Sequence, residues 1–560
     1  MLRKSRRISQ IFFISLFFII VFGLNTYPRA YVYPVEWFLQ LNPLTAVLTS
    51  IASRDIMFGS VIIGAIIIAL TIIFGRIFCG FVCPLGAVID FSDRFLFKRR
   101  PPKMRRPSVF LQKFKYIFLI AVLILAGFGV LFSFLIDPIS LFTRTVVIIL
   151  YPLLMILRLD SIELIAPVIQ KLGAEDVLLL SFKTPLFYGS VAVLIIFALI
   201  LAGGYWERRF WCQYVCPSGA FFGLLSRFAL FRRSVRRISC NGCNGGNTCA
   251  KVCPVSAIDH TDVFATSTSE CVVCGVCTDI KDSCSEFSLT SQGKTVITGT
   301  NLGRRQLVAG AASGALLIPV YRGNAEKMHD DFGRIIRPPG ALPEKEFLAR
   351  CTGCGNCVKA CKTNAIQLCQ FKDGFSRVYS PKLVPKIGEC EEKCHICGHV
   401  CPTGAIRPLS YEVKRFAKIG TAVINKDKCL PWEQNKECLV CDEVCPYNAI
   451  TTKLLETPYG KFKVPVVNED LCLGCGICEK HCPIFDESAI CVFKFSENRI
   501  SKGPYVSASE KKKILKTRKK SDKALGAVFD KPGEVRPDTT DSLPKKEAQE
   551  TQELPEGFDF

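Results

Sequence analysis

The pattern of hydrophobic and polar positions divides the chain near residue 230. Before that point, long apolar runs alternate with short polar or basic segments, whereas the later part is polar and rich in cysteine. A helix that spans a membrane needs about 20 predominantly apolar residues. The runs of suitable length and composition are 8–24, 57–78, 116–136 and 187–204. They predict an α-helical membrane bundle of four spans.

Basic segments indicate how this bundle is oriented. Residues 94–106 contain seven Lys and Arg and no acidic residue, and residues 227–237 contain five and no acidic residue. Loops enriched in Lys and Arg remain on the cytoplasmic side, so an even number of crossings must separate the two segments. Spans 116–136 and 187–204 supply two crossings. The remaining apolar run, within 139–180, is therefore expected to lie outside the membrane or to dip partway into it.

Cysteine spacing indicates the chemistry. Most of the 30 cysteines stand in C-x-x-C-x-x-C-x-x-x-C runs or close variants of them. Three closely spaced thiolates of such a run bind one [4Fe–4S] cluster, and the fourth usually reaches a partner cluster. The sets predict about six clusters in α+β ferredoxin-like domains: Cys240, Cys243, Cys249 and Cys253; Cys271, Cys274, Cys277 and Cys284; Cys351, Cys354, Cys357 and Cys361; Cys390, Cys394, Cys397 and Cys401; Cys429, Cys438, Cys441 and Cys445; Cys472, Cys475, Cys478 and Cys482.

Zinc sites and disulfides are the alternatives to clusters. Zinc ligands usually form two C-x-x-C pairs separated by a dozen or more residues. Here, by contrast, the four cysteines of a set lie within about eleven residues. Disulfide frameworks belong to short secreted chains and do not repeat a cluster spacing. In five of the six sets, an Ala-Ile pair follows the fourth cysteine, which suits a short turn packed on an inorganic core: 257–258, 365–366, 405–406, 449–450 and 489–490. Iron–sulfur clusters are therefore favoured.

Four further cysteines belong to an internal repeat at an offset of 133 residues. The sequences RIFCGFVCPLGA and RFWCQYVCPSGA end the second and fourth predicted spans and contain Cys79, Cys83, Cys212 and Cys216. Cysteines at i and i+4 share one helix face. These thiols could bind a metal, cycle between thiol and disulfide, or pack as small apolar side chains. The repetition argues against packing alone, but metal binding and redox cycling both remain open.

A mid-chain segment has the pattern of an export signal. Arg304 and Arg305 directly precede residues 306–321, which are apolar and rich in Gly and Ala. This is typical of a twin-arginine translocation signal. A thiol-rich domain exported unfolded would be oxidised in the periplasm, so it must cross already folded with its clusters. We expect 306–321 to remain as a fifth, anchoring span. A glycine-rich linker with an accidental Arg-Arg pair is the alternative.

Other features narrow the range of functions. The five histidines all lie outside the predicted spans, which excludes membrane b-haems held by paired histidines. The net charge of +22 comes mostly from cytoplasmic loops and from a charged tail after about residue 508, which is expected to be disordered. Nothing resembles a nucleic-acid-binding module. The sequence also contains no nucleophile triad, phosphate loop or dinucleotide fingerprint, so one-electron transfer is the predicted chemistry.

Two family resemblances follow from these motifs. Residues 1–290 resemble NapH-type membrane polyferredoxins, with CxxxCP motifs at 79–84 and 212–217. Residues 300–495 resemble NapG-type periplasmic ferredoxins through FLARCTGCGNCVKAC, CPTGAI and DLCLGCGICEKHCP. The resemblance implies a quinol dehydrogenase electron-transfer subunit in the bacterial inner membrane, without substrate chemistry of its own. It would pass electrons from quinol to a periplasmic reductase, such as nitrate reductase, or to a multihaem cytochrome. A factor for metalloenzyme maturation and a non-catalytic redox sensor are the alternative functions.

The expected organisation has five parts. They are a membrane domain (1–230), a cytoplasmic two-cluster domain (231–298), a signal and anchor (299–322), a periplasmic four-cluster domain (323–500) and a charged tail (501–560). In the cytoplasmic pair, Cys253 is expected to complete the cluster of Cys271, Cys274 and Cys277, while Cys284 completes that of Cys240, Cys243 and Cys249. In the periplasmic domain, the resemblance to four-cluster subunits implies that the first set pairs with the fourth and the second with the third.

Overall fold

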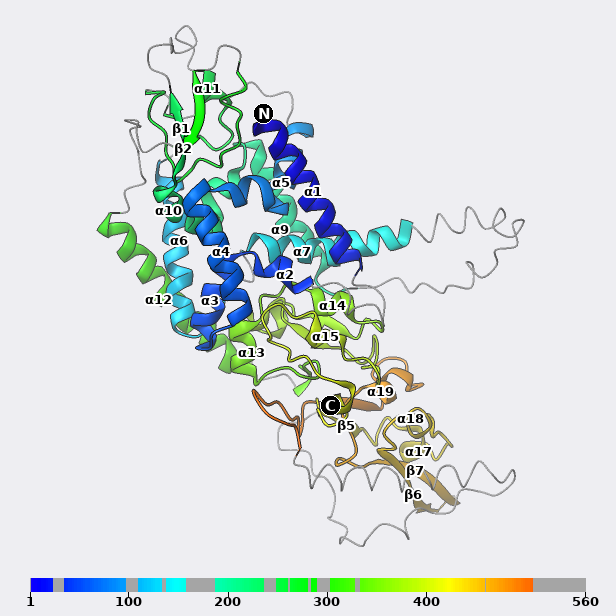
Figure 1. Cartoon of the computed structure of the whole chain (residues 1–560). Helices are drawn as coiled ribbons and strands as arrows, with labels where there is room; N and C mark the ends of the chain where they lie inside the picture. Colours follow the sequence, from blue (N-terminus) through cyan, green and yellow to red (C-terminus); the bar gives the residue numbers. More distant parts are fainter. Residues whose placement is uncertain are drawn as a thin grey trace, which may run out of the picture.

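The computed structural model describes residues 2–23, 35–96, 109–132, 137–157, 187–235, 248–259, 262–280, 284–289, 303–327, 333–458 and 460–506. Figure 1 shows a helical bundle in the middle, with one cysteine-rich domain at each end. The smaller domain contains the described residues among 231–289 and is called the inner domain here. The larger one contains residues 333–506 and is called the outer domain. Cys240, Cys243 and the part of the charged tail after residue 506 lie outside the described residues.

Five helices run along the bundle axis (Figure 1): α1 (Leu2–Gly23), α4 (Phe58–Phe74), α6 (Val109–Gly127), α9 (Ser190–Ala202) and α12 (Arg304–Lys327). Contacts at the helix ends give their directions. At the start of α1, Arg3 pairs with Asp279 of the inner domain at 3.1 Å, and at its end the Val21 carbonyl accepts a hydrogen bond from Lys359 of the outer domain. The helix α9 begins at the outer domain, where the Tyr188 N–H donates to Gln367 at 2.9 Å.

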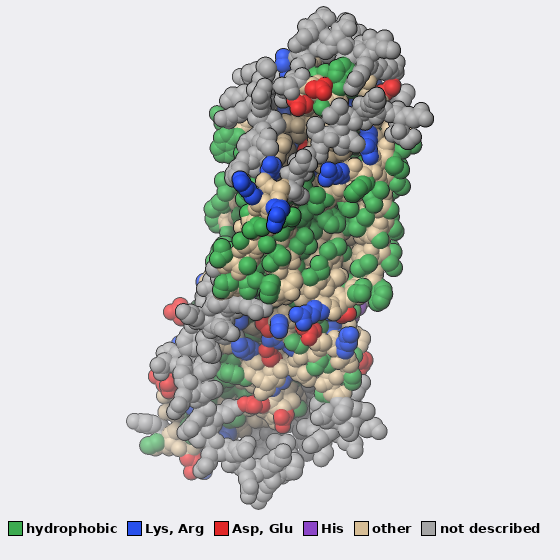
Figure 2. All heavy atoms as spheres, turned by 90° about the vertical axis from the view of Figure 1, so that its left-hand side faces the viewer, with side chains coloured by type: hydrophobic (Ala, Val, Ile, Leu, Met, Phe, Trp, Pro, Cys, Tyr) green, Lys and Arg blue, Asp and Glu red, His purple; other side chains and the backbone are tan. Residues whose placement is uncertain are grey.

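The structure confirms helices at the predicted spans, but it does not establish a membrane bundle. Among the described residues, two helices, Leu2–Phe22 and Pro138–Leu157, are long and apolar enough to cross a membrane. Residues 43–53, 58–74 and 190–205 form shorter apolar helices. The structure therefore places helices within the four predicted spans but does not establish four crossings. Figure 2 shows a broad band of hydrophobic side chains on one face of the bundle, with charged side chains above and below it.

The apolar run around Arg144 forms a helix that lies transverse to the bundle axis, at the end next to the outer domain. It consists of α7 (Pro138–Thr145), the π-helical turn η4 (Val146–Leu150) and residues up to 157. Figure 1 shows this helix running across the direction of α4 and α6, next to the outer domain. Asp137 caps α7, because its carboxylate accepts the Ser140 N–H at 2.8 Å.

Short helices complete the bundle. They are α2 (Val35–Gln40), α3 (Pro43–Ser53), η2 (Phe78–Val82), α5 (Pro84–Phe95), η6 (Gly203–Tyr205), η7 (Trp211–Val215), α10 (Pro217–Leu225) and η8 (Ser226–Phe228). The two copies of the repeat have the same local structure, a π-helical turn followed by an α-helix that begins at proline. Proline at the first helical position costs no hydrogen bond, since that N–H has no partner within the helix.

The segment after Arg304 and Arg305 packs tightly along α6. Its two glycines, Gly310 and Gly314, stand one helical turn apart against the backbone of α6. An added Cβ would lie 2.9 Å from the Ile117 carbonyl oxygen at Gly310 and 2.9 Å from the Ala121 carbonyl oxygen at Gly314. Small residues at this spacing allow two helices to approach closely.

The cysteine-rich domains contain short helices and two-stranded antiparallel sheets. The inner domain has α11 (Thr248–Val252) and the pair β1 (Phe231–Val235) and β2 (Ser285–Leu289). The outer domain pairs β3 (Ile366–Leu368) with β4 (Pro381–Leu383), β5 (Thr421–Ile424) with β8 (Ile490–Phe493), and β6 (Ile450–Thr457) with β7 (Gly460–Val467). Its helices are α13 (Glu344–Arg350), α14 (Asn356–Ala360), η10 (Phe371–Asp373), η11 (Phe375–Arg377), α15 (Ile396–His399), α16 (Tyr411–Lys414), α17 (Leu430–Glu433), α18 (Val440–Glu443) and α19 (Ile477–His481).

Candidate iron–sulfur centres

Left-handed backbone shapes the loops between the cysteines. In the C-x-x-C-x-x-C loop that starts at Cys351, Gly353 and Gly355 have φ values of 60° and 86°. Side chains with a Cβ rarely adopt this conformation. It lets the chain fold back on itself, so that the Gly353 N–H donates to the thiol of Cys351 and the Asn356 N–H donates to that of Cys354. Such backbone donors stabilise negative charge on sulfur.

The structure also gives a physical reason for the Ala-Ile pairs. The residue before each of four pairs has positive φ: Ser256, Asn364, Gly404 and Asn448, at 49°, 56°, 61° and 48°. This turn directs backbone amides at the preceding cysteine. The Ala257 N–H lies 3.3 Å from the Cys253 sulfur, and the Ala449 N–H lies 3.3 Å from the Cys445 sulfur. The alanine and isoleucine of each pair are buried beside the thiols.

In the outer domain the thiols gather into four groups, and each group takes its fourth cysteine from a neighbouring set. Electrostatic interactions between the thiols define the groups. Centre I is Cys351, Cys354, Cys357 and Cys401; centre II is Cys361, Cys390, Cys394 and Cys397; centre III is Cys429, Cys438, Cys441 and Cys482; centre IV is Cys445, Cys472, Cys475 and Cys478. Two cavities agree with this grouping, because all four thiols of centre I line one and all four of centre III line the other.

The expected pairing of the outer sets was wrong. The first set exchanges its fourth cysteine with the second set, and the third exchanges with the fourth. The physical reason is local packing, since α14 packs against α15 and α18 packs against α19. Each of these helices carries the third cysteine of its set, so the contacts bring consecutive sets together.

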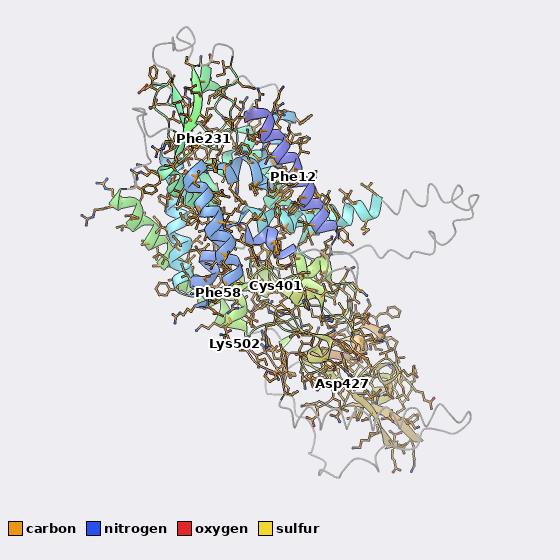
Figure 3. All side chains as sticks on the ribbon, viewed as in Figure 1. Phe12, Phe58, Phe231, Cys401, Asp427 and Lys502 are labelled. Atoms are coloured by element: carbon orange, nitrogen blue, oxygen red, sulfur yellow. The ribbon has the colours of Figure 1, made fainter. Side chains whose placement is uncertain are left out.

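The four centres follow one another in the order I, II, IV, III. Cys357 of centre I interacts with Cys397 of centre II, and Cys478 of centre IV interacts with Cys441 of centre III. Centres II and IV meet where the Cys390 N–H donates to the Cys475 carbonyl at 2.8 Å. Figure 3 places Cys401, a residue of centre I, close to the end of the bundle, while Asp427 lies farther out near centre III.

The inner domain follows the expected exchange where the structure describes it. Cys253 interacts with Cys274, and Cys271 interacts with Cys274, Cys277 and Cys253. The second inner group includes Cys249, which is buried beside Cys277. Since Cys240 and Cys243 lie outside the described residues, the role of Cys284 as the fourth ligand of that group stays a prediction.

The four cysteines of the repeat also meet. Cys83 interacts electrostatically with Cys79 and Cys212, and Cys216 interacts with the other three thiols. We call this group the bundle thiols. They lie next to the inner domain, because Cys79 packs against the hydrophobic cluster that contains Cys274. Each copy of the repeat needs a glycine next to its thiols. An added Cβ would lie 2.9 Å from the Cys79 carbonyl oxygen at Gly86 and 3.2 Å from the Cys212 carbonyl oxygen at Gly219.

Buried cations surround the bundle thiols. Arg76 pairs with Glu270 at 3.0 Å, and Lys115 pairs with the same carboxylate at 2.5 Å. Arg209 pairs with Asp90 at 2.6 Å. The two repeat arginines cross over, because Arg76 reaches Gly219 of the second copy and Arg209 reaches Gly86 of the first.

Around the bundle thiols, cations outnumber their carboxylate partners. Arg6 is a second partner of Asp90, so four buried cations share Glu270 and Asp90. A half-buried third carboxylate, Asp93, accepts the backbone N–H of Arg209 at 3.0 Å. Charge buried in a low dielectric requires compensation, and thiolates bound to a metal would supply it.

Cations also stand beside centres I and II. Arg144 donates to the Gly353 carbonyl at 2.8 Å and lies near the thiols of Cys351 and Cys354. Burial lowers the pKa of Lys359 to about 7. Lys414 donates to the Cys394 carbonyl at 2.6 Å; burial lowers its pKa, but the neighbouring thiols of Cys390, Cys397 and Cys394 outweigh this effect and raise it overall.

The thiol groups fit polynuclear clusters in their chemistry. In the part of the chain that the structure describes, no group of three or more His, Cys, Asp or Glu side chains closes on a single metal ion. The thiols of centres I and III instead line cavities, and the empty space in the cavity of centre I is about 340 Å³, including the part open to solvent. The donors are all sulfur, as [4Fe–4S] clusters require.

Comparison with known families agrees with this chemistry. A 4Fe-4S binding domain matches residues 56–103, 188–237 and 396–419, and a second 4Fe-4S binding domain matches 347–367. A 4Fe-4S dicluster domain matches residues 436–485, which contain most ligands of centres III and IV. The chain therefore binds several [4Fe–4S] clusters.

Individual relatives match about a third of the chain. The methylamine utilization ferredoxin-type protein MauM of Methylophilus methylotrophus is 39% identical over 160 residues, which cover 28% of this chain and 69% of the relative. The ferredoxin-type protein NapG of Escherichia coli is 35% identical over 206 residues, covering 35% of this chain and 87% of the relative. The ferredoxin-type protein NapF of the same organism is 33% identical over 151 residues, covering 27% and 80%.

The position of Lys414 leads to an electrochemical prediction. A buried cation near a cluster favours the reduced, more negative state, so Lys414→Gln should make the reduction potential of centre II more negative. We expect a shift of about 60 mV, which corresponds to a tenfold change in the equilibrium constant for one electron. A redox titration followed by electron paramagnetic resonance measures it. Lys426→Gln, which removes a cation lying over Trp432, is the matched control and should leave centre II unchanged. An unshifted potential in the Lys414 variant would refute the assigned role.

Proposed function

Because the chain belongs to the family of ferredoxin-type iron–sulfur proteins that includes MauM and NapG, we propose that it is a membrane-bound relay that carries electrons from quinol to a periplasmic redox partner. The observation that carries this proposal is the unbroken order of centres I, II, IV and III. The order begins at the end of the helical bundle and leads away from it. Consecutive clusters in such a row allow an electron to move in short steps.

A membrane location of the bundle is supported by three features. On the face of the bundle seen in Figure 2, a hydrophobic band lies between two charged zones. The helices α1, α4, α6, α9 and α12 follow its axis, and the described parts of the two basic segments, 94–96 and 227–235, adjoin the inner end. Under the rule that basic loops stay inside, the inner domain is cytoplasmic and the outer domain is periplasmic.

Export of the outer domain would depend on the twin-arginine motif. The helix α12 runs parallel to α6 through the contacts of Gly310 and Gly314, and it enters the outer domain, where the Tyr321 hydroxyl donates to the Ser376 carbonyl at 2.9 Å. A segment packed in this way is suited to remain as an anchor after translocation.

Replacing Arg304 and Arg305 by lysine tests this route. The folded-protein translocase requires the arginine pair, so the outer domain should stay in the cytoplasm, protected from protease added to spheroplasts. In the wild-type protein, protease should digest the outer domain and spare the inner one. A wild-type outer domain that is itself protected would contradict the proposed sidedness.

Centre III is the proposed exit for electrons. It is the last centre in the row, and its ligand Cys482 is followed closely by Phe485, whose side chain is 97% exposed. An exposed aromatic side chain beside a cluster suits transient contact with a redox partner. A periplasmic reductase or a multihaem cytochrome is the class of partner that this exit fits.

Quinol-driven reduction of the clusters tests the function directly. Purified protein in liposomes should lose visible cluster absorbance within the turnover time when a reduced quinol analogue is added, because the electrons enter the centres. The same protein reduced chemically with dithionite supplies the full amplitude. Absence of quinol-driven bleaching in protein that dithionite still reduces would contradict the role as a quinol dehydrogenase subunit.

We also propose that the bundle thiols hold a redox metal centre. Cys79, Cys83, Cys212 and Cys216 interact with one another as the thiols of the outer centres do, and they face a surplus of buried cations. The 4Fe-4S binding domain matches both segments that contain them. A further [4Fe–4S] cluster fits this arrangement, because its thiolates would add negative charge beside four cations that share two carboxylates, whereas a disulfide carries no charge.

Iron content distinguishes a [4Fe–4S] cluster at the bundle thiols from a reversible disulfide or another metal. Replacing all four bundle thiols by serine should remove about four iron atoms per chain, because one [4Fe–4S] cluster is lost. Cys369→Ser with Cys491→Ser is the matched control, since these two buried cysteines belong to no set. Unchanged iron in the four-serine variant would exclude a cluster there. Loss of copper with unchanged iron would favour the alternative function in metalloenzyme maturation.

A further inference from the structure

Two loops of the outer domain share the pattern C-x-G-C-G-x-C. One starts at Cys351 and the other at Cys472. Their backbones agree, because the glycine that precedes the short helix, Gly355 in the first loop and Gly476 in the second, has a φ of 86° or 81°. The variable positions are Thr352 and Asn356 in the first loop and Leu473 and Ile477 in the second. The loop therefore folds without a polar side chain at either position, and the polar pair at centre I has another reason.

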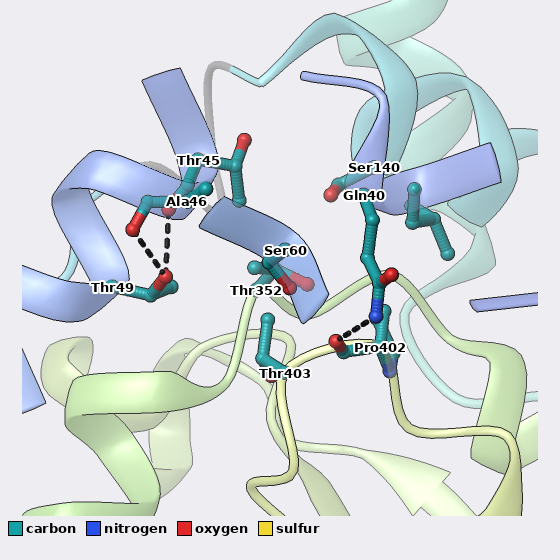
Figure 4. Close-up of a pocket in the computed structure, with 10 residues that line it drawn as sticks. Gln40, Thr45, Ala46, Thr49, Ser60, Ser140, Thr352, Pro402 and Thr403 are labelled. Atoms are coloured by element: carbon teal, nitrogen blue, oxygen red, sulfur yellow. Dashed lines mark hydrogen bonds between the residues drawn. The ribbon is translucent and has the colours of Figure 1, made fainter. Parts of the chain in front are cut away.

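Thr352 already acts on a ligand of centre I. The residue is 3% exposed, and its hydroxyl donates to the thiol of Cys354. Thr352 lies where centre I meets the helical bundle (Figure 4), and it lines both the cavity of centre I and a small polar cavity between centre I and the bundle. A hydrogen bond to sulfur stabilises negative charge there.

The side chain of Asn356 is buried without a partner. The residue is 0% exposed and lines the cavity of centre I together with the four thiols. Its backbone N–H donates to the Cys354 thiol, but neither polar atom of its side-chain amide forms a hydrogen bond with a described residue. Buried polar groups in folded proteins are rarely left unpaired, because the desolvation is costly. The amide is therefore suited to a partner inside the cavity.

The chemistry of the donor identifies this partner. The thiols of centre I are the ligands of a [4Fe–4S] cluster, and the sulfur atoms of such a cluster accept hydrogen bonds but donate none. The NH2 group of asparagine carries two donors. Cluster sulfur can thus satisfy the amide nitrogen of Asn356, which Ile477 lacks at the corresponding position of centre IV.

We propose that the Asn356 side chain donates a hydrogen bond to a sulfur atom of the centre I cluster and thereby favours its reduced state. The reduced cluster carries one more negative charge than the oxidised cluster, so a hydrogen-bond donor stabilises it more. This inference goes beyond the proposed function, because it concerns how readily centre I is reduced, whatever the source of the electron.

Asn356→Leu tests the proposal, because leucine has nearly the same shape and no donor. In the full-length protein with wild-type iron content, one component of a redox titration followed by electron paramagnetic resonance should move to a more negative potential. We expect a tenfold change in the equilibrium constant, or about 60 mV for one electron. Ile477→Leu is the matched control, since it changes the corresponding position of α19 without loss of a polar group, and it should leave every potential unchanged. Unchanged potentials in Asn356→Leu would overturn the proposal.

A second measurement uses the wild-type protein and does not depend on how well the variant folds. The protein is produced with asparagine that carries 15N only in the side-chain amide, reduced with dithionite and studied by pulsed electron paramagnetic resonance. A hyperfine coupling from this nitrogen should be present in the wild type and absent from Asn356→Leu. A wild-type spectrum without the coupling would show that the amide binds another partner, such as an ordered water, and a coupling that persists in the variant would come from another asparagine. Either result would overturn the proposal, and neither bears on quinol as the natural donor, because dithionite supplies the electrons.

Discussion

The outer domain depends on one constraint, the exchange of the fourth cysteine between neighbouring sets. A set of three closely spaced cysteines can hold only part of a cluster, so Cys401 must reach centre I and Cys361 must reach centre II. This exchange fixes the first two sets against each other, and the second exchange does the same for centres III and IV. The contact between Cys390 and Cys475 then joins the two pairs. The row of centres is thus a direct consequence of how each cluster is completed.

The second requirement of the structure is that buried negative charge on the thiolates is compensated. Thiolates bound to a cluster carry negative charge that is costly to bury. Buried cations stand near three of the thiol groups: Arg76 and Arg209 near the bundle thiols, Arg144 near centre I and Lys414 near centre II. At these three places the cations offset part of the negative charge that bound thiolates would carry.

The sequence predicted the chemistry better than the spatial order. Spacing alone identified the cysteine sets, and local rules explain why: the glycines and the Ala-Ile turns act within a few residues of each cysteine. The exchange that involves Cys253 was also correct. The pairing in the outer domain was not, because it depends on which short helices pack together, such as α14 on α15. No local pattern encodes that choice.

In the helical bundle, too, the sequence predicted the local chemistry better than the spatial arrangement. The repeat predicted that Cys79 and Cys212 are equivalent, but only the structure shows the two pairs meeting, with Arg76 and Arg209 crossing to the opposite copy. Arg144, which interrupts an apolar run in the sequence, proves to bind the centre I loop. The small cavity between α2, α3, α4, α7 and the loops of centre I was not predictable, because its residues come from segments far apart in the chain that share no motif.

A cryo-electron microscopy map of the holoprotein, at a detail that shows cysteine ligation, tests the central claim most directly. Density for one cluster should connect to Cys351, Cys354, Cys357 and Cys401, and density for the next should connect to Cys390, Cys394, Cys397 and Cys361. A cluster bound by Cys351, Cys354, Cys357 and Cys361 would contradict the exchange of fourth cysteines. So would a first cluster whose fourth ligand is a cysteine of the fourth set. The order I, II, IV, III would fall with it.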